Sequence, residues 1–167
     1  MVLKPTIAHG KCVRVFRVAL ILTVILLCLA TCAYAAPVIY LRVYDWKTGE
    51  LYAETEGQIG SKLVFGWIHS LEKIPWNEYY RVDENRGLIL DAITFPAFGA
   101  GIPENKGRVN YVKDGLIHME EIGQEFTEIV WLNSHTATRE ITLDGKHVAR
   151  GSELPQHTRL RLVIEAP

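Results

Sequence analysis

Cysteine is scarce in this sequence and absent from most of it. Three of the 167 residues are cysteines, Cys12, Cys28 and Cys32, and all of them precede residue 36. The remaining residues therefore offer no disulfide, no thiol nucleophile and no cysteine ligand for a metal. A chain of this length makes one ordinary domain, whose core is large enough to fold without covalent or metal support.

The sequence also lacks an excess of positive charge and the standard catalytic motifs. Residues 1–35 contain four basic residues and no acidic one, whereas the rest of the chain contains 14 basic and 19 acidic residues, a formal net charge of −5. An acidic body with scattered aromatic residues is not expected to bind nucleic acid. No phosphate-binding glycine loop, His-Glu-x-x-His pair or Gly-x-Ser-x-Gly elbow is present, and no cofactor is expected.

Residues 1–36 form either a signal peptide or a transmembrane anchor. Residues 18–36 are 19 residues without a charge, and the basic residues of the segment precede them. This run is typical of a cleaved secretory signal with a small-residue site at Ala33-Tyr34-Ala35, and equally of a membrane-spanning helix of about 20 residues. In both interpretations the N-terminus stays in the cytoplasm and the body is exported. A third interpretation is lipidation at Cys32, because Leu29-Ala30-Thr31-Cys32 resembles a bacterial lipobox.

Residues 37–167 are predicted to form one all-β domain. Short runs with period-2 alternation recur about every ten residues and are separated by turn residues, as is typical of an antiparallel β-sandwich or an open barrel. Asp114-Gly115 and Asp144-Gly145 predict two hairpin turns. A hydrophobic helix in the N-terminal segment precedes this domain. The expected strands are Val38–Tyr44, Glu50–Thr55, Lys62–His69, Glu78–Val82, Leu88–Phe95, Arg108–Val112, Gly115–Glu120, Glu125–Leu132, Arg139–Leu143, His147–Ala149 and Thr158–Glu165.

The densest polar cluster, from His69 to Glu78, is the first candidate binding site. It follows a strongly hydrophobic strand and contains an imidazole, the Ser70 hydroxyl and the carboxylates of Glu72 and Glu78. We expect it to be a loop at one end of the sheet, where it could bind a cation or a basic group of a ligand or partner. The alternative is structural, with the serine turning the chain and the carboxylates paired to nearby basic residues or backbone amides.

A loop rich in glycine and proline, Phe98–Glu104, is the second candidate. Gly99 and Gly101 allow the backbone to turn sharply or to approach another group closely, and Glu104 adds a carboxylate. The alternative interpretation is a tight crossover between sheets.

These two segments resemble motifs of a prokaryotic family known as domain of unknown function 1850. The resemblance covers most of residues 38–165, with Leu71 standing where valine is common and Ile102 where leucine is common. It implies a small exported β-rich domain, and it implies an accessory role because such members are often encoded beside TRAP-type solute transporters of the TAXI class. It supplies no catalytic residue. The residues that carry it are His69-Ser70-Leu71-Glu72, Pro75, Glu78-Tyr79-Tyr80, Phe95 and Phe98-Gly99-Ala100-Gly101-Ile102-Pro103.

The sequence therefore favours an exported, membrane-associated, non-enzymatic accessory protein, located in the periplasm or on the outer face of the cell membrane. Its partners would be the membrane or solute-binding subunits of such a transporter. The alternative is a small-ligand or metal-binding domain that uses His69, Glu72, Glu78 and Glu104, and a hydrolase is a third hypothesis. A partner role predicts an exposed apolar patch, whereas a ligand role predicts a concave pocket at the His69 loop.

Overall fold

The computed structural model describes residues 17, 20–23, 37–99, 101 and 103–167. The chain separates into two units, residues 1–36 and 37–167. In the first unit, Arg17 and Leu20–Thr23 are helical. The three cysteines and the small-residue site at residues 33–35 lie outside the described residues. Among the described residues, no helix combines the length and the apolar character needed to cross a membrane.

The second unit is built from strands, as predicted. Its only other regular element within the described residues is a 3₁₀ helix, η1 (Gly151–Glu153). The strands are β1 (Val38–Asp45), β2 (Leu51–Gln58), β3 (Lys62–Ile68), β4 (Pro75–Val82), β5 (Leu88–Phe95), β6 (Val109–Lys113), β7 (Leu116–Phe126), β8 (Glu128–Leu132), β9 (Thr138–Leu143), β10 (Lys146–Arg150) and β11 (Arg159–Glu165).

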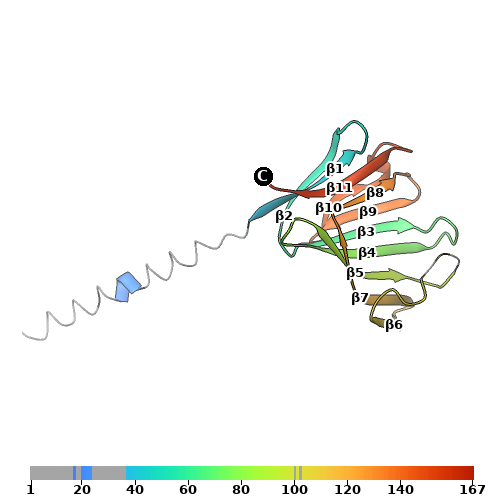
Figure 1. Ribbon diagram of the computed structural model, residues 1–167, viewed down its shortest axis with the longest axis horizontal. Helices are drawn as coiled ribbons and strands as arrows, with labels where there is room; N and C mark the ends of the chain where they lie inside the picture. Colours follow the sequence, from blue (N-terminus) through green and yellow to red (C-terminus); the bar gives the residue numbers. More distant parts are fainter. Residues whose placement is uncertain (1–16, 18–19, 24–36, 100, 102) are drawn as a thin grey trace, which may run out of the picture. The chain divides into compact units, whose positions relative to one another are not determined.

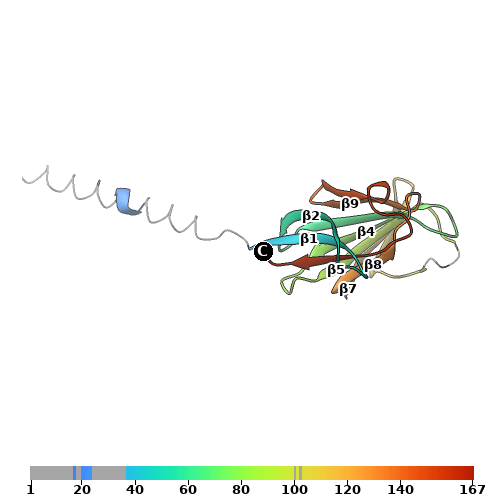
Figure 2. The ribbon, with the colours of Figure 1, turned by 90° about the horizontal axis from the view of Figure 1, so that it is seen from above.

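The strands form two antiparallel sheets (Figures 1 and 2). The smaller sheet has the order β2-β1-β11-β8 and the larger one the order β10-β9-β3-β4-β5-β7-β6. Each sheet has two edge strands, so the prediction of a β-sandwich is confirmed and the barrel does not close. The predicted strand Glu125–Leu132 is two strands, because Glu125 pairs with Ile89 in the larger sheet and Glu128 pairs with Val163 in the smaller one. The chain therefore changes sheet at Thr127.

Period-2 alternation places the apolar side chains between the sheets. In β1, Ile39, Leu41 and Val43 are buried, and Leu160 and Leu162 are buried beside them on β11. The facing side chains of the larger sheet include Leu63, Phe65, Leu90, Ile93, Met119, Ile141 and Leu143, all of them buried. This arrangement gives the domain a continuous core without cysteine.

Both predicted Asp-Gly hairpin turns are confirmed. Asp114 and Gly115 have φ values of 53° and 75°, and Asp144 and Gly145 have φ values of 50° and 75°. Two successive residues with positive φ match the twist of the strands that they connect. The register agrees, since Lys113 pairs with Leu116 across the first turn.

Three connections meet at one end of the sandwich, which we call the loop end. They are residues 69–74 between β3 and β4, residues 96–108 between β5 and β6, and residues 133–137 between β8 and β9. Ile68 donates a backbone hydrogen bond of 2.8 Å to Ala137, which joins the first and third connections. The body begins at the opposite end, where Tyr40 pairs with Glu165 near the C-terminus (Figure 1).

Candidate functional site

His69 and Glu72 belong to a tight turn at the loop end. The backbone N–H of His69 donates to Ile74 O and that of Lys73 donates to His69 O, each at 2.8 Å. The backbone N–H of Glu72 donates to Nδ1 of His69 at 3.4 Å. The turn is closed by Lys73, whose φ is 57°. The His69 imidazole therefore helps to fold this turn.

The His69 ring packs into an aromatic cluster and is 9% exposed. Its centroid lies 5.6 Å from that of Trp67 and 5.9 Å from that of Trp76. Trp76 in turn stacks on Phe95, with centroids 4.7 Å apart and an angle of 7° between the planes. The cluster ties the β3–β4 turn to β5 and holds the imidazole in one place.

The structure brings the two candidate segments together at Glu72 and Gly99. A Cβ atom on Gly99 would overlap the Cγ and Cδ atoms of Glu72, so a larger residue at this position would require the Glu72 side chain to move. Gly101 has a φ of +79°, which turns the loop, whereas Ser70 and Glu104 are exposed. The second candidate loop therefore touches the first at Glu72, and both Glu72 and Gly99 remain exposed.

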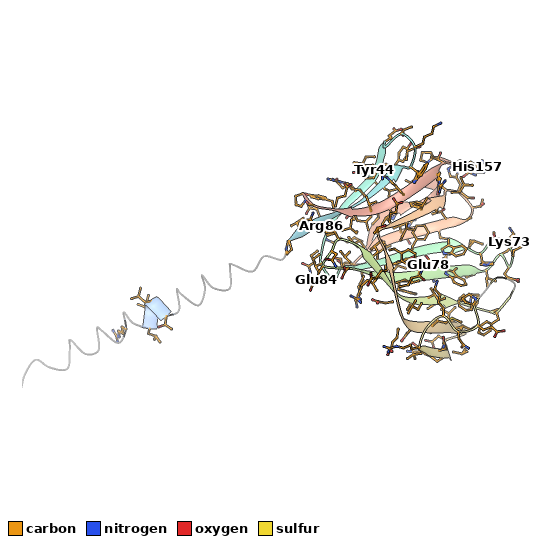
Figure 3. All side chains as sticks on the ribbon, viewed as in Figure 1. Tyr44, Lys73, Glu78, Glu84, Arg86 and His157 are labelled. Carbon is orange, nitrogen blue, oxygen red and sulfur yellow. The ribbon has the colours of Figure 1, made fainter. Side chains whose placement is uncertain are left out.

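Glu78 does not belong to this loop, which corrects the sequence-based placement. Strand β4 begins at Pro75, three residues before the predicted start, because Pro75 pairs with Ile68 and Trp76 with Trp67. Alternation from Trp76 then puts Glu78 on the inner face, directly opposite Phe65 and beside Ile93. Figure 3 shows Lys73 at the turn and Glu78 further along β4. The two carboxylates thus lie in different surroundings.

Tyr80 fixes the carboxylate of Glu78. The Tyr80 hydroxyl donates a hydrogen bond of 2.6 Å to Oε2 of Glu78, and Tyr80 itself is 4% exposed. Burial, the nearby charge of Glu78 and this hydrogen bond raise the pKa of Tyr80 well above its ordinary value. The phenol therefore stays protonated and remains a donor at physiological pH.

A cavity of about 300 Å³ opens beside Glu78, between the larger sheet and β8. Glu78 is its one ionisable lining residue, and the walls are mostly aromatic and aliphatic. His69 does not line it, so this cavity differs from the pocket that a ligand role predicted at the His69 loop. The lining residues are Phe65, Trp67, Glu78, Ile129, Val130, Trp131, Leu132, Ala137 and Thr138.

A larger hollow of about 750 Å³ lies on the outer face of the larger sheet. Several of its polar side chains pair with one another. The Tyr79 hydroxyl and the Thr94 hydroxyl lie 3.3 Å apart, Arg81 pairs with Asp91, and the Tyr111 hydroxyl donates to Glu120. These three pairs account for six of the polar side chains of the hollow.

Sequence reasoning did not single out Phe65, Trp67 and Trp131 as binding residues. The alternation of Lys62–His69 places Phe65, Trp67 and His69 on one face of the strand. This pattern could have identified Phe65 and Trp67 as lining residues of a common site. Trp131 comes from the other sheet, and its contact with Phe65, with centroids 5.2 Å apart, depends on how the sheets pack. Among the residues that the structure describes, no three His, Cys, Asp or Glu side chains gather closely enough to hold a metal ion.

Comparison with known proteins identifies the family. No curated protein and no solved structure matches the chain. The sequence model of the family described as "Domain of unknown function (DUF1850)" matches residues 63–149, which run from β3 into β10 and include the loop-end turn, Gly99 and Glu78. This match covers more than half of the 167 residues and agrees with the resemblance carried by the His69 and Gly99 segments. The chain therefore belongs to the DUF1850 family.

Proposed function

We propose that this protein is an exported accessory component of a TAXI-class TRAP solute-uptake system, which it serves by binding a partner rather than by catalysis. Two observations support the proposal. The first is the basic and apolar N-terminal segment ahead of an acidic body. The second, which carries the proposal, is an exposed apolar surface at the loop end.

This surface, which we call the apolar end, consists of Leu71, Phe98 and Leu132. Their exposed fractions are 68%, 56% and 66%. Leu71 lies in the β3–β4 connection, Phe98 lies in the β5–β6 connection, and Leu132 ends β8. Leu71 and Phe98 are brought near each other because their chain neighbours Glu72 and Gly99 are in contact. We take Leu132, at the end of β8, to extend this surface, because apolar side chains that gather on the surface of a folded domain are typical of a protein interface.

The charge of the body indicates what kind of surface fits there. Residues 36–167 have a formal net charge of −5, so long-range electrostatics favour a partner surface that is apolar at its centre and basic at its rim. We assign that surface to an extracytoplasmic face of the transporter's membrane or solute-binding subunit.

Replacing Leu71 and Phe98 together by serine should reduce the retention of these subunits at least tenfold. Leu71 is exposed, so its replacement should change the stability by no more than about 0.5 kcal/mol. Phe98 also packs edge to face on Phe95, with ring centroids 5.7 Å apart, so its replacement should cost about 0.5–1.5 kcal/mol. The measurement is quantitative recovery of both subunits with the tagged full-length chain from detergent-solubilised native membranes. Val38→Ser is the matched control, because Val38 is 44% exposed but lies at the opposite end of the body. Equal retention by the double variant would refute the docking surface, and a wild-type chain that retains neither subunit would refute the accessory role.

Export makes a separate prediction about topology. A reporter that is active only outside the cytoplasm, fused after Pro167, should be active, because the basic residues precede the apolar run. The control is the same fusion with residues 1–36 deleted, which should be inactive. If a cytoplasm-specific reporter at the same position were active instead, the body would not be exported and the proposed partner would be unreachable.

Small-ligand binding is a second candidate function, and the position of Glu78 favours it. A carboxylate on the inner face of a sheet is costly to bury, yet this one lies at a cavity with aromatic walls. Both functions are compatible, because the cavity and the apolar end share only Leu132.

A further inference from the structure

We propose that the cavity beside Glu78 binds a small organic ammonium cation, with Glu78 as the counter-ion and Phe65, Trp67 and Trp131 as the aromatic walls. This proposal rests on the second candidate function, small-ligand binding, and names the class of ligand.

The position of Glu78 is the first argument. Its neighbours across the sheet are Phe65, which is 4% exposed, and Ile93, which is fully buried. Within the described residues, no lysine, arginine or histidine forms an ion pair with Glu78. Tyr80 supplies one hydrogen bond to a group that accepts about four. A bound cation would balance this half-buried charge, which a neutral ligand does not do.

The walls are the second argument. Phe65 and Trp131 meet edge to face with centroids 5.2 Å apart, and Trp67 lines the same cavity from β3. The faces of such rings attract cations, most strongly for tryptophan and for cations that carry methyl groups and are weakly hydrated. Aromatic walls around one carboxylate therefore select a cation with an apolar surface over a compact, strongly hydrated metal ion.

The size and the remaining lining residues limit the ligand further. A volume of about 300 Å³ lies at the lower end of the range for small-molecule pockets. The lining contains no positively charged residue, so a ligand that also buries an anionic group would find no partner for it. The ligand is thus a small cation without an anionic group in its buried part.

The probes for the test are choline and 3,3-dimethylbutan-1-ol, which have nearly the same shape and differ in charge. Full-length protein in a neutral maltoside detergent is titrated with each probe while the indole N–H signals of the four tryptophans are followed by NMR. We expect choline to shift the Trp67 and Trp131 signals saturably and the neutral alcohol to bind at least tenfold more weakly. Trp46 is the internal reference, because it does not line the cavity.

Glu78→Gln should weaken choline binding at least tenfold, because it removes the charge and keeps an acceptor for the Tyr80 hydroxyl. Glu72→Gln is the matched control and should leave choline binding within twofold of the wild type, since Glu72 lies outside the cavity. Two results would contradict the proposal that the ligand is a cation: the alcohol binds as tightly as choline, or Glu78→Gln binds choline as tightly as the wild type does. In either case the cavity would still bind ligands. If neither probe shifts these signals, ligand binding in this cavity is refuted as well. The comparison of the two probes on the wild type stands even if a variant fails to fold.

Discussion

Replacing Asn133 by aspartate should destabilise the domain by at least about 3 kcal/mol. Asn133 is fully buried at the loop end, and its Nδ2 atom donates to the backbone carbonyls of Gly151, Leu154 and Pro155 at 3.0, 3.2 and 3.0 Å. Aspartate has the same shape but places a negative carboxylate among these three acceptors. A buried charge without a partner costs roughly 3–5 kcal/mol, a large share of the 5–15 kcal/mol that typically stabilises a domain.

Thermal denaturation followed by circular dichroism should show this loss as a midpoint lowered by about 10 °C or more. The stability gap to the wild type should narrow as the pH falls from 7 towards 4. Burial raises the pKa of the introduced carboxyl in the folded state, so folding favours its protonated form and the penalty disappears below the unfolded pKa.

Asn110→Asp is the control for this prediction. Asn110 also donates through Nδ2 to a backbone carbonyl, that of Gly107 at 2.9 Å, but it is exposed. The same substitution there should cost no more than about 0.5 kcal/mol. Equal midpoints for the two variants would show that the buried hydrogen bonds of Asn133 do not hold the loop end together.

Replacing Trp76 by alanine should have an effect of similar size, roughly 3–5 kcal/mol. Trp76 is 6% exposed, stacks on Phe95 and contacts the rings of Trp67 and His69. Its removal leaves a cavity beneath the β3–β4 turn. The midpoint of thermal unfolding should fall by about 10 °C or more.

Trp76→Phe separates the packing of the ring from the indole N–H. The Nε1 atom of Trp76 is buried and has no hydrogen-bond partner in the described part of the chain. Phenylalanine at this position keeps a ring against Phe95, and no hydrogen bond of the indole is lost. The substitution should therefore lower the free energy of unfolding by about 1 kcal/mol. If Trp76→Ala melted within 2 °C of the wild type, the aromatic cluster would not be what fastens the turn to β5.

These two positions also separate stability from binding. Neither Asn133 nor Trp76 lines the cavity beside Glu78 or belongs to the apolar end. Loss of binding in Glu78→Gln or in the Leu71 and Phe98 variant, at an unchanged melting temperature, therefore reports on function rather than on folding.

Much of the strand pattern could be predicted from the sequence, because it depends on neighbours in the chain. The alternation in Val38–Tyr44 and Thr158–Glu165 requires one buried face, and Leu41 and Leu162 are buried accordingly. The turns at Asp114-Gly115 and Asp144-Gly145 follow from the positive φ values that these residues tolerate. The family could also be recognised from the short His69 and Gly99 segments alone.

The candidate site was only half predictable. The sequence pointed to His69, Glu72 and Gly99, and the structure places the Glu72 side chain next to Gly99. The sequence-based strand began only at Glu78, the last residue of the polar cluster, because the polar run from His69 hides the first three residues of β4. The pairing of Trp76 with Trp67 shows that the strand begins before Glu78, and the pairing register decides which face each side chain takes.

By itself, the sequence determined the all-β class, the hairpin turns and the absence of cysteine chemistry in residues 37–167. It also singled out the His69 and Gly99 segments, which carry the family resemblance. Only the tertiary structure decided that the chain changes sheet at Thr127, that Glu78 faces the interior and that Trp131 joins Phe65 and Trp67 around a cavity. The reason is physical. Local patterns set the conformation of each strand, whereas the packing of two sheets joins residues more than 60 positions apart, such as Phe65 and Trp131.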